Sequence, residues 1–180
     1  MRPIFTIHAG EFLVGEYLER SFKGIRVWVP TKDSGVDLLV TNARNTRAVS
    51  LQVKFSRDFL TTHMDTAYQR PLRACGWWSL NRGKIENSSA DFWVFALIGS
   101  KKRSHDFVII EPKDLLNRLD NIHRKQKIVQ TYIWVTESER CWEARGLSKP
   151  DGLKIAENTF ESKSRDLTAY LNNWEMVRAL

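Results

Sequence analysis

The chain has 180 residues, of which 42% are hydrophobic and 27% are charged, a composition typical of one soluble globular domain. Lysine and arginine outnumber aspartate and glutamate by 28 to 21, which favours a polyanionic partner without identifying it. No apolar run of about 18 residues predicts a membrane span, and the first residues show no signal-peptide pattern. We therefore expect a cytoplasmic protein that does not act at a membrane.

The two cysteines, Cys75 and Cys141, lie far apart, and neither belongs to a CxxC pair. This pattern indicates neither a disulfide framework nor a zinc site. We expect two reduced thiols.

The first 55 residues predict one helix followed by three strands. Residues 9–22 are good helix formers without proline, and Gly24 ends the helix. Alternating apolar residues then predict the strands, with a turn at 42–46 joining the last two as a hairpin. The predicted strands are 25–29, 36–41 and 48–55.

The rest of the chain predicts further strands and helices around the same sheet. Residues 56–90 predict a loop with one or two short helices, and residues 145–158 read as irregular. The remaining predicted elements are strands 91–98, 106–111 and 128–135, a helix from Pro112, and a C-terminal helix 164–177. The predicted fold class is α/β, with one central mixed sheet and helices on both sides.

The segment from Gly35 to Phe55 carries the residues that point to a function. Side chains alternate between the two faces of a strand, so Gln52 and Lys54 lie opposite an apolar face. In the preceding strand, Asp37 likewise lies opposite the apolar residues. A hairpin places the two strands side by side, so Asp37, Gln52 and Lys54 are expected to converge.

These residue types suit the hydrolysis of a phosphodiester bond. A hard cation such as Mg²⁺ prefers oxygen ligands, and the Asp37 carboxylate, the Gln52 amide oxygen and the Val53 backbone carbonyl are candidates. Such an ion lowers the pKa of a bound water and neutralises phosphate charge. Lys54 is placed to orient the water or to stabilise developing charge. A second carboxylate would strengthen the site, and the N-terminal helix offers Glu11, Glu16 and Glu19.

Together these residues resemble the signature of the PD-(D/E)XK nuclease superfamily. Asp37, a hairpin and then Gln52-Val53-Lys54 are similar to its D…(D/E/Q)xK pattern, above all in the glutamine-bearing branches. Those branches include Mrr-type restriction enzymes and intron-endonuclease-like or Holliday-resolvase-like domains. The similar segments are Gly10-Glu11, Gly24-Ile25-Arg26-Val27, Asp37-Leu38-Leu39-Val40, Gln52-Val53-Lys54 and Asp91-Phe92-Trp93-Val94-Phe95. Val36 stands where the proline of the signature would be, and Gln52 replaces an acidic ligand.

The resemblance implies a restriction-endonuclease-like core of four or five strands at about 5–111, with 112–180 as an extension of a single domain, 1–180. It implies Mg²⁺-dependent hydrolysis of DNA, with Mn²⁺ as a substitute, in restriction, defence or recombination and repair. The site residues it implies are Glu11, Asp37, Gln52 and Lys54. Glu11 matches the helix glutamate because it follows Gly10 directly, and Glu16 is the alternative. Cleavage of both strands needs two active sites, so a homodimer is expected.

Gln52 leaves a second interpretation open, because a neutral amide binds a cation less strongly than a carboxylate does. The alternative is a catalytically inactive DNA-binding or assembly module that retains the nuclease fold. A third interpretation is an RNA-directed nuclease or an unrelated α/β protein. In a protein without this site, Asp37 and Lys54 would form an ordinary exposed ion pair.

Basic side chains outside the motif are weaker candidates for phosphate contacts, since such runs are commonly solvated turns. The candidates are Arg57, Lys101, Lys102 and Arg103. Trp77 and Trp78 either stack on bases or pack within the protein or a dimer, and we expect packing.

Overall fold

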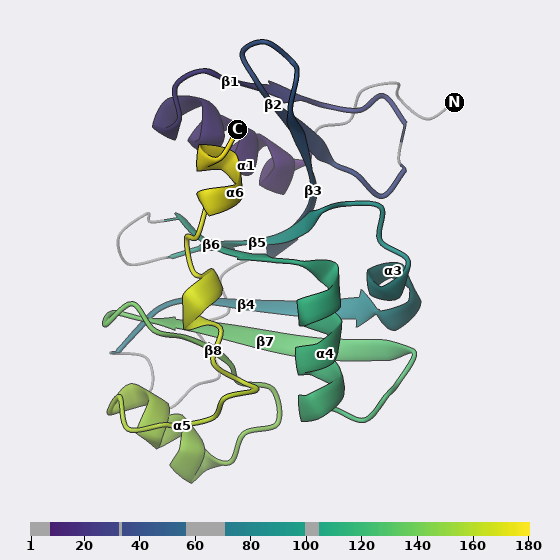
Figure 1. Cartoon of the computed structure of the whole chain (residues 1–180). Helices are drawn as coiled ribbons and strands as arrows, with labels where there is room; N and C mark the ends of the chain where they lie inside the picture. The colour runs from purple at the N-terminus through teal and green to yellow at the C-terminus, as the bar shows by residue number, and fades with distance from the viewer. Residues whose placement is uncertain (1–7, 33, 57–70, 100–104) are drawn as a thin grey trace.

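A computed structural model describes residues 8–32, 34–56, 71–99 and 105–180 (Figure 1). Within them, a five-stranded sheet has β3 and β5 parallel and all its other neighbouring strands antiparallel. Its strands in spatial order are β1 (Ile25–Trp28), β2 (Leu38–Asn42), β3 (Ala48–Ser56), β5 (Phe92–Ile98) and β6 (His105–Ile110). The predicted mixed sheet flanked by helices is confirmed, and these strands agree with the predicted ones to within two residues.

One face of the five-stranded sheet is covered by α1 (Ala9–Ser21) and by the C-terminal segment with α6 (Glu175–Arg178) (Figure 1). Val14 and Leu18 of α1 are fully buried against the sheet, and Trp174 fills the space beside them. The strand residues of this cluster are Leu38, Val40, Leu51, Val53, Val94, Ala96, Phe107 and Ile109. The odd-numbered side chains of β3 therefore face α1, as the alternation predicted.

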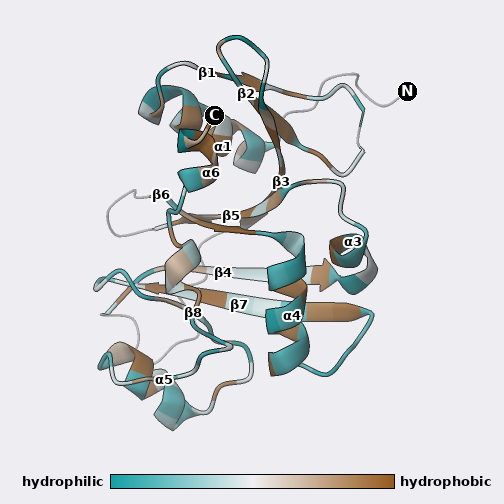
Figure 2. Ribbon diagram, in the orientation of Figure 1, coloured by the Kyte–Doolittle hydropathy of each residue, from teal (hydrophilic) through white to brown (hydrophobic). Residues whose placement is uncertain are grey.

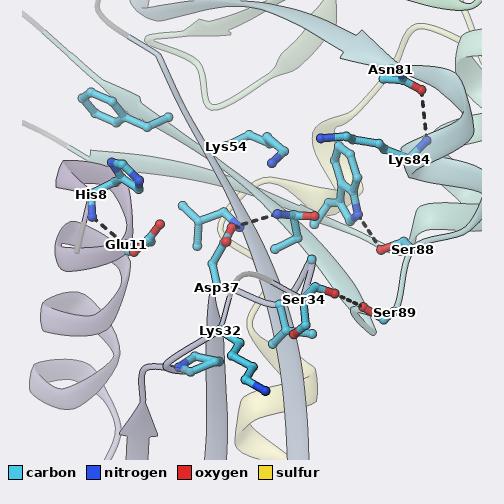
Figure 3. Close-up of a pocket in the computed structure, with 18 of the residues that line it drawn as sticks. His8, Glu11, Lys32, Ser34, Asp37, Lys54, Asn81, Lys84, Ser88 and Ser89 are labelled. Carbon is cyan, nitrogen blue, oxygen red and sulfur yellow. Dashed lines mark hydrogen bonds between the residues drawn. The ribbon is translucent and has the colours of Figure 1, made fainter. Parts of the chain in front are cut away.

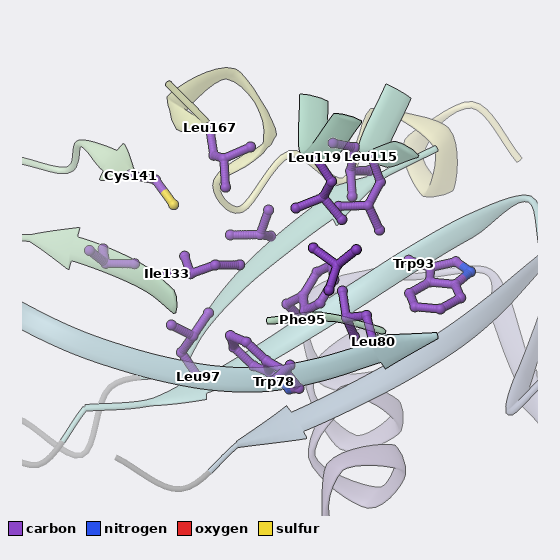
Figure 4. Close-up of a cluster of buried hydrophobic side chains, with 14 of the residues drawn as sticks. Trp78, Leu80, Trp93, Phe95, Leu97, Leu115, Leu119, Ile133, Cys141 and Leu167 are labelled. Carbon is purple, nitrogen blue, oxygen red and sulfur yellow. The ribbon is translucent and has the colours of Figure 1, made fainter. Parts of the chain in front are cut away.

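The other face of the five-stranded sheet packs on a second, three-stranded antiparallel sheet (Figure 4). Its strands are β4 (Leu72–Asn81), β7 (Ile128–Thr136) and β8 (Cys141–Glu143). The short helix α3 (Arg82–Glu86) follows β4, and α4 (Pro112–Ile122) borders the same core. β5 contributes side chains to the cores on both faces of the five-stranded sheet, and Figure 2 shows it as a mainly hydrophobic strand.

The prediction of one sheet, with residues 56–90 as a loop bearing short helices, is wrong for the part that the structure describes. Only α3 agrees with it, because β4 occupies ten residues of this segment. Leu72, Ala74, Trp78 and Leu80 are all buried, which is the alternation of a strand. Trp78 belongs to the core, and Trp77 packs on Tyr132 at a ring-centroid distance of 5.4 Å, so the expected packing is confirmed.

The outer face of the second sheet carries α5 (Lys149–Ala156), in a segment that was predicted to be irregular. The Ser148 side chain caps the helix by accepting a hydrogen bond from the Asp151 N–H, and Pro150 stands in the first turn. Proline is tolerated there because the first N–H groups of a helix have no partner within it. That prediction was therefore wrong, since Pro150 marks a helix start.

The predicted C-terminal helix 164–177 is also wrong. This segment contains a short 3₁₀ turn, η1 (Thr168–Tyr170), and then α6. Asn172 adopts a positive φ of 51°, and its side chain accepts a hydrogen bond from the Phe107 N–H at 2.8 Å. Leu171 forms a β-bridge with Val108. The segment thus bonds to the edge strand β6 instead of satisfying its own backbone groups in a helix.

Cys75 and Cys141 are buried free thiols, which confirms the expectation for them. Burial raises the pKa of the Cys141 thiol well above its usual range. Within the described residues, no helix is both long and apolar enough to span a membrane.

Candidate active site

Every residue of the predicted site lines one open pocket of about 1460 Å³ (Figure 3). The N-terminal turn of α1 contributes Glu11, the position just before β2 contributes Asp37, and β3 contributes Gln52, Val53 and Lys54. The β1–β2 loop and α3 complete the pocket wall. The predicted convergence therefore occurs, across segments separated by up to 43 positions, from Glu11 to Lys54.

The pocket lies where β3 continues beyond its neighbour β2. The β2–β3 ladder ends at the pair Leu38 and Leu51, whereas β3 runs on to Ser56 alongside β5. From Val53 onward, this edge of β3 faces no other strand among those described. Backbone groups at an unpaired strand edge need other hydrogen-bond partners. The Asp37 carboxylate is the partner of one of them, the Val53 N–H.

The Asp37 carboxylate is held against β3 by two hydrogen bonds to the same oxygen. The Val53 N–H donates to Oδ2 at 2.7 Å, and the Gln52 side-chain Nε2 donates to it at 3.0 Å. The Asp37 N–H in turn donates to the Leu51 carbonyl at 2.8 Å. Among the described residues, Asp37 Oδ1 has no hydrogen-bond partner. Asp37 also does not form the ion pair with Lys54 that is expected of a protein without an active site here.

Val53 contributes through its backbone. An extended residue directs its N–H and C=O to the same edge of the strand. Because the Val53 N–H reaches Asp37, the Val53 carbonyl also belongs to the Asp37 edge. Its predicted role as an oxygen donor beside Asp37 is thus compatible with the direction of β3.

Lys54 lies over a buried aromatic ring. Its Nζ is 5.0 Å from the centre of the Trp93 ring, a cation–π distance. Trp93 is 2% exposed, and its indole N–H donates to the Ser88 hydroxyl at 2.9 Å. Trp93 neighbours Gln52 in the parallel β3–β5 register, so a fixed ring supports the ammonium group on the pocket side of the sheet.

Glu11 is the half-buried carboxylate of the helix terminus. Its Oε2 accepts a hydrogen bond from the His8 N–H at 3.2 Å, in the manner of a capping box. Burial raises the pKa of Glu11 above its ordinary value, and the charge of Asp37 acts in the same direction, while the His8 hydrogen bond and Lys54 oppose them. Glu16, the alternative, pairs with Arg20 on the helix surface at 2.9 Å and does not line the pocket.

Gly10 brings α1 close enough to β3 for Glu11 to reach the pocket. A Cβ atom at position 10 would lie 2.5 Å from the Phe55 Cβ and 3.3 Å from a Val53 methyl group. Only glycine allows this approach without a shift of the helix or the strand.

The donors at this site suit a hard divalent cation in type. The Asp37 and Glu11 carboxylates, the Gln52 amide oxygen and the Val53 carbonyl are all oxygen donors. The described residues contain no cluster of three or more His, Cys, Asp or Glu side chains that could hold a metal. A cation bound here would therefore need the Gln52 amide oxygen and the Val53 carbonyl oxygen as ligands in addition to the two carboxylates.

Gln52 faces Asp37 with its amide nitrogen, so the amide must turn over to present Oε1 beside the carboxylate.

The weaker phosphate candidates Arg57, Lys101, Lys102 and Arg103 lie outside the described residues.

Sequence reasoning missed the polar residues of the pocket walls. Lys32 enters from the β1–β2 loop, while Lys84 and Ser89 come from α3 and the turn after it. No motif marks them, and only the recognition of β4 as a strand would have placed α3 beside the site.

No protein-family model, curated protein or solved structure matches the chain.

Proposed function

We propose that this chain is a divalent-metal-dependent DNA endonuclease of the PD-(D/E)XK type, acting in the cytoplasm in restriction, defence or recombination and repair. The observation that carries the proposal is that Glu11, Asp37 and Lys54 line one pocket. Gln52 and Val53 line the same pocket, and the Val53 backbone N–H donates a hydrogen bond to Asp37. The D…QxK signature, the mixed five-stranded sheet and the excess of basic residues support it. A homodimer, with one site for each strand, is part of the proposal.

In this function Asp37, Glu11 and the Gln52 amide oxygen would hold Mg²⁺ or Mn²⁺. The bound ion would supply charge neutralisation at the phosphate and activation of a water molecule. Val53 holds the Asp37 carboxylate through its N–H, which fixes Oδ2 and leaves Oδ1 without a hydrogen-bond partner among the described residues. Lys54, supported by Trp93, would orient the water or stabilise charge that develops on the phosphate oxygens.

One observation favours a second candidate, an inactive DNA-binding or assembly module with the same fold. The Gln52 side-chain amide donates a hydrogen bond to Asp37 Oδ2, so this oxygen has partners without any cation. Such a module would bind DNA with equal affinity whether or not divalent metal is present.

The test is cleavage of supercoiled plasmid with Mg²⁺ or Mn²⁺, comparing the wild type with Asp37→Ala and Lys54→Ala. The matched controls are Glu16→Gln for Glu11→Gln on the same helix, and Lys23→Ala for Lys54→Ala. We expect metal-dependent nicking that Asp37→Ala, Lys54→Ala and Glu11→Gln abolish and both controls retain. DNA binding without cleavage of plasmid or branched DNA in either metal would overturn the catalytic proposal in favour of the module.

A further inference from the structure

Two lysines outside the D…QxK motif reach the pocket from different walls. Lys32 belongs to the loop between β1 and β2, and Lys84 belongs to α3. Figure 3 shows Lys84 extending from α3 toward Lys54, and Lys32 on the other side of Asp37. Both side chains are exposed, unlike the half-buried Lys54.

The positive charges of these two lysines have no acidic partner in the described part of the chain. Within the part of the chain that the structure describes, neither Lys32 nor Lys84 forms an ion pair with a carboxylate. Among the described lining residues there are three lysines and two carboxylates, those of Glu11 and Asp37. A divalent cation at the carboxylates would increase this positive excess, which favours an anionic ligand such as a phosphate backbone.

The wall that carries Lys84 is anchored at several points. The Asn81 side chain caps α3 by accepting a hydrogen bond from the Lys84 N–H at 3.2 Å, and Ile85 is 1% exposed in the core. The Ser89 hydroxyl donates to the Ser34 carbonyl at 3.0 Å, which joins the α3 wall to the β1–β2 loop. The backbones that carry the two lysines are thus connected at one end of the pocket.

The pocket volume of about 1460 Å³ exceeds what one cation and one phosphate require. It is also above the range of about 300–1,000 Å³ that is common for small-molecule sites. Its open shape and its walls of mixed polar and apolar residues suit a segment of a polymer that enters on one side and leaves on the other.

We propose that Lys32 and Lys84 bind the backbone phosphates on either side of the phosphate held at Asp37 and Lys54, so that a DNA strand crosses the pocket from the β1–β2 loop to α3. Lysine binds phosphate as a point charge, and such contacts position a strand without reading its sequence. The inference rests on the proposed function for the place of the central phosphate. The flanking contacts do not require cleavage and are measured separately.

The test is the salt dependence of DNA binding by the full chain in EDTA, followed by fluorescence anisotropy. The probes are a labelled DNA duplex and its separated single strand. The variants are Lys32→Ala, Lys84→Ala and Lys84→Arg, and the control is Lys23→Ala. Lys23 is also exposed but follows the far end of α1, which runs about 15 Å from Glu11 to Ser21 at a rise of about 1.5 Å per residue.

Each pocket substitution to alanine should reduce the slope of log K against log salt by about 0.9 on duplex, or about 0.7 on single strand. Lys84→Arg and Lys23→Ala should leave the slope unchanged. The probe that shows the change identifies the form of DNA that crosses the pocket. Unchanged slopes for Lys32→Ala and Lys84→Ala on both probes would overturn the inference, even if the plasmid assay shows a nuclease. Reduced slopes in a protein that never cleaves would support the strand path and refute only the proposed catalysis.

Discussion

Replacement of Gln52 by glutamate tests how the site behaves with and without metal. In the structure the Gln52 amide nitrogen donates a hydrogen bond to Asp37 Oδ2 at 3.0 Å, an attractive contact that needs no cation. Gln52→Glu replaces this donor with a second carboxylate at nearly the same position. The variant introduces an acidic residue at the position where the proposed nuclease signature commonly has one, and it removes the interaction that stabilises the metal-free form.

The expected destabilisation without metal follows from two terms. The lost hydrogen bond to a charged group contributes about 1.5–3 kcal/mol. Repulsion of two carboxylates about 4 Å apart is about 4 kcal/mol at an effective dielectric constant of about 20. Uptake of one proton limits the repulsion, because raising a glutamate pKa from about 4.3 to about 7 costs about 3.7 kcal/mol. Both side chains are half-exposed and screened by water, so we expect a total of about 2–4 kcal/mol at about pH 7.

The sign of the pH dependence follows from the same pair. A carboxyl pair that shares a proton in the folded state has one raised pKa. Stability of Gln52→Glu in EDTA should therefore be highest at acidic pH and fall as the pH rises through that raised pKa. Mn²⁺ or Mg²⁺ should restore the lost stability, because a cation between the carboxylates removes their repulsion.

The assay is urea unfolding in EDTA and in Mn²⁺, with Gln52→Met as the control. Methionine removes the amide without adding charge, so it should lose only the hydrogen bond and gain nothing from metal. If Gln52→Glu is as stable as the wild type in EDTA and shows no greater response to Mn²⁺, Gln52 does not share a cation position with Asp37.

Three further predictions concern the surroundings of the site. Because burial raises the pKa of Glu11, this residue contributes stability that is present at acidic pH and lost as the pH rises through the raised pKa; Glu11→Gln should remove this component of urea unfolding in EDTA, and an unchanged pH profile would contradict it. Gly10→Ala should destabilise the protein by about 1–3 kcal/mol and reduce Mn²⁺ affinity, since its Cβ would meet Phe55 at 2.5 Å; calorimetry that finds wild-type affinity would refute the role of Gly10. Asp106→Asn should cost about 3–5 kcal/mol in urea unfolding by removing the buried carboxylate that pairs with Arg73 at 2.6 and 2.9 Å, because the remaining partner of Arg73, Glu139, is exposed and lies 3.4 Å away; a loss below about 1 kcal/mol would contradict that argument.

The convergence of Asp37, Gln52 and Lys54 could be predicted because it depends on local geometry. Strand alternation fixes which side chains share a face, and the hairpin fixes which strands are neighbours. The structure adds that Asp37 stands just before the first paired residue of β2, where it reaches the Val53 N–H. That detail depends on where the ladder ends, which side-chain periodicity does not contain.

The second sheet was missed because its signals are partly long-range. The alternation of β4 is interrupted by a register shift between Leu72 and Ala74, and Gly76 breaks the apolar run. A Cβ at Gly76 would lie 2.2 Å from the Trp78 ring, so this glycine makes room for the indole. Arg73 is polar in sequence but pairs with a buried carboxylate 33 positions away. No local pattern shows such a partner.

The residues that local patterns place and the residues that depend on tertiary packing have different proposed roles. Asp37, Gln52 and Lys54 lie on or directly before β2 and β3, where strand periodicity places them, and the family resemblance points to Glu11 on α1. Lys84, in contrast, depends on the packing of β4 and α3 against β5. Phosphate contacts on such walls set which DNA forms enter, while the strand residues act on whatever phosphate arrives. Substitutions at Lys84 should therefore change DNA affinity and salt dependence more than the metal requirement, and substitutions at Asp37 should do the reverse.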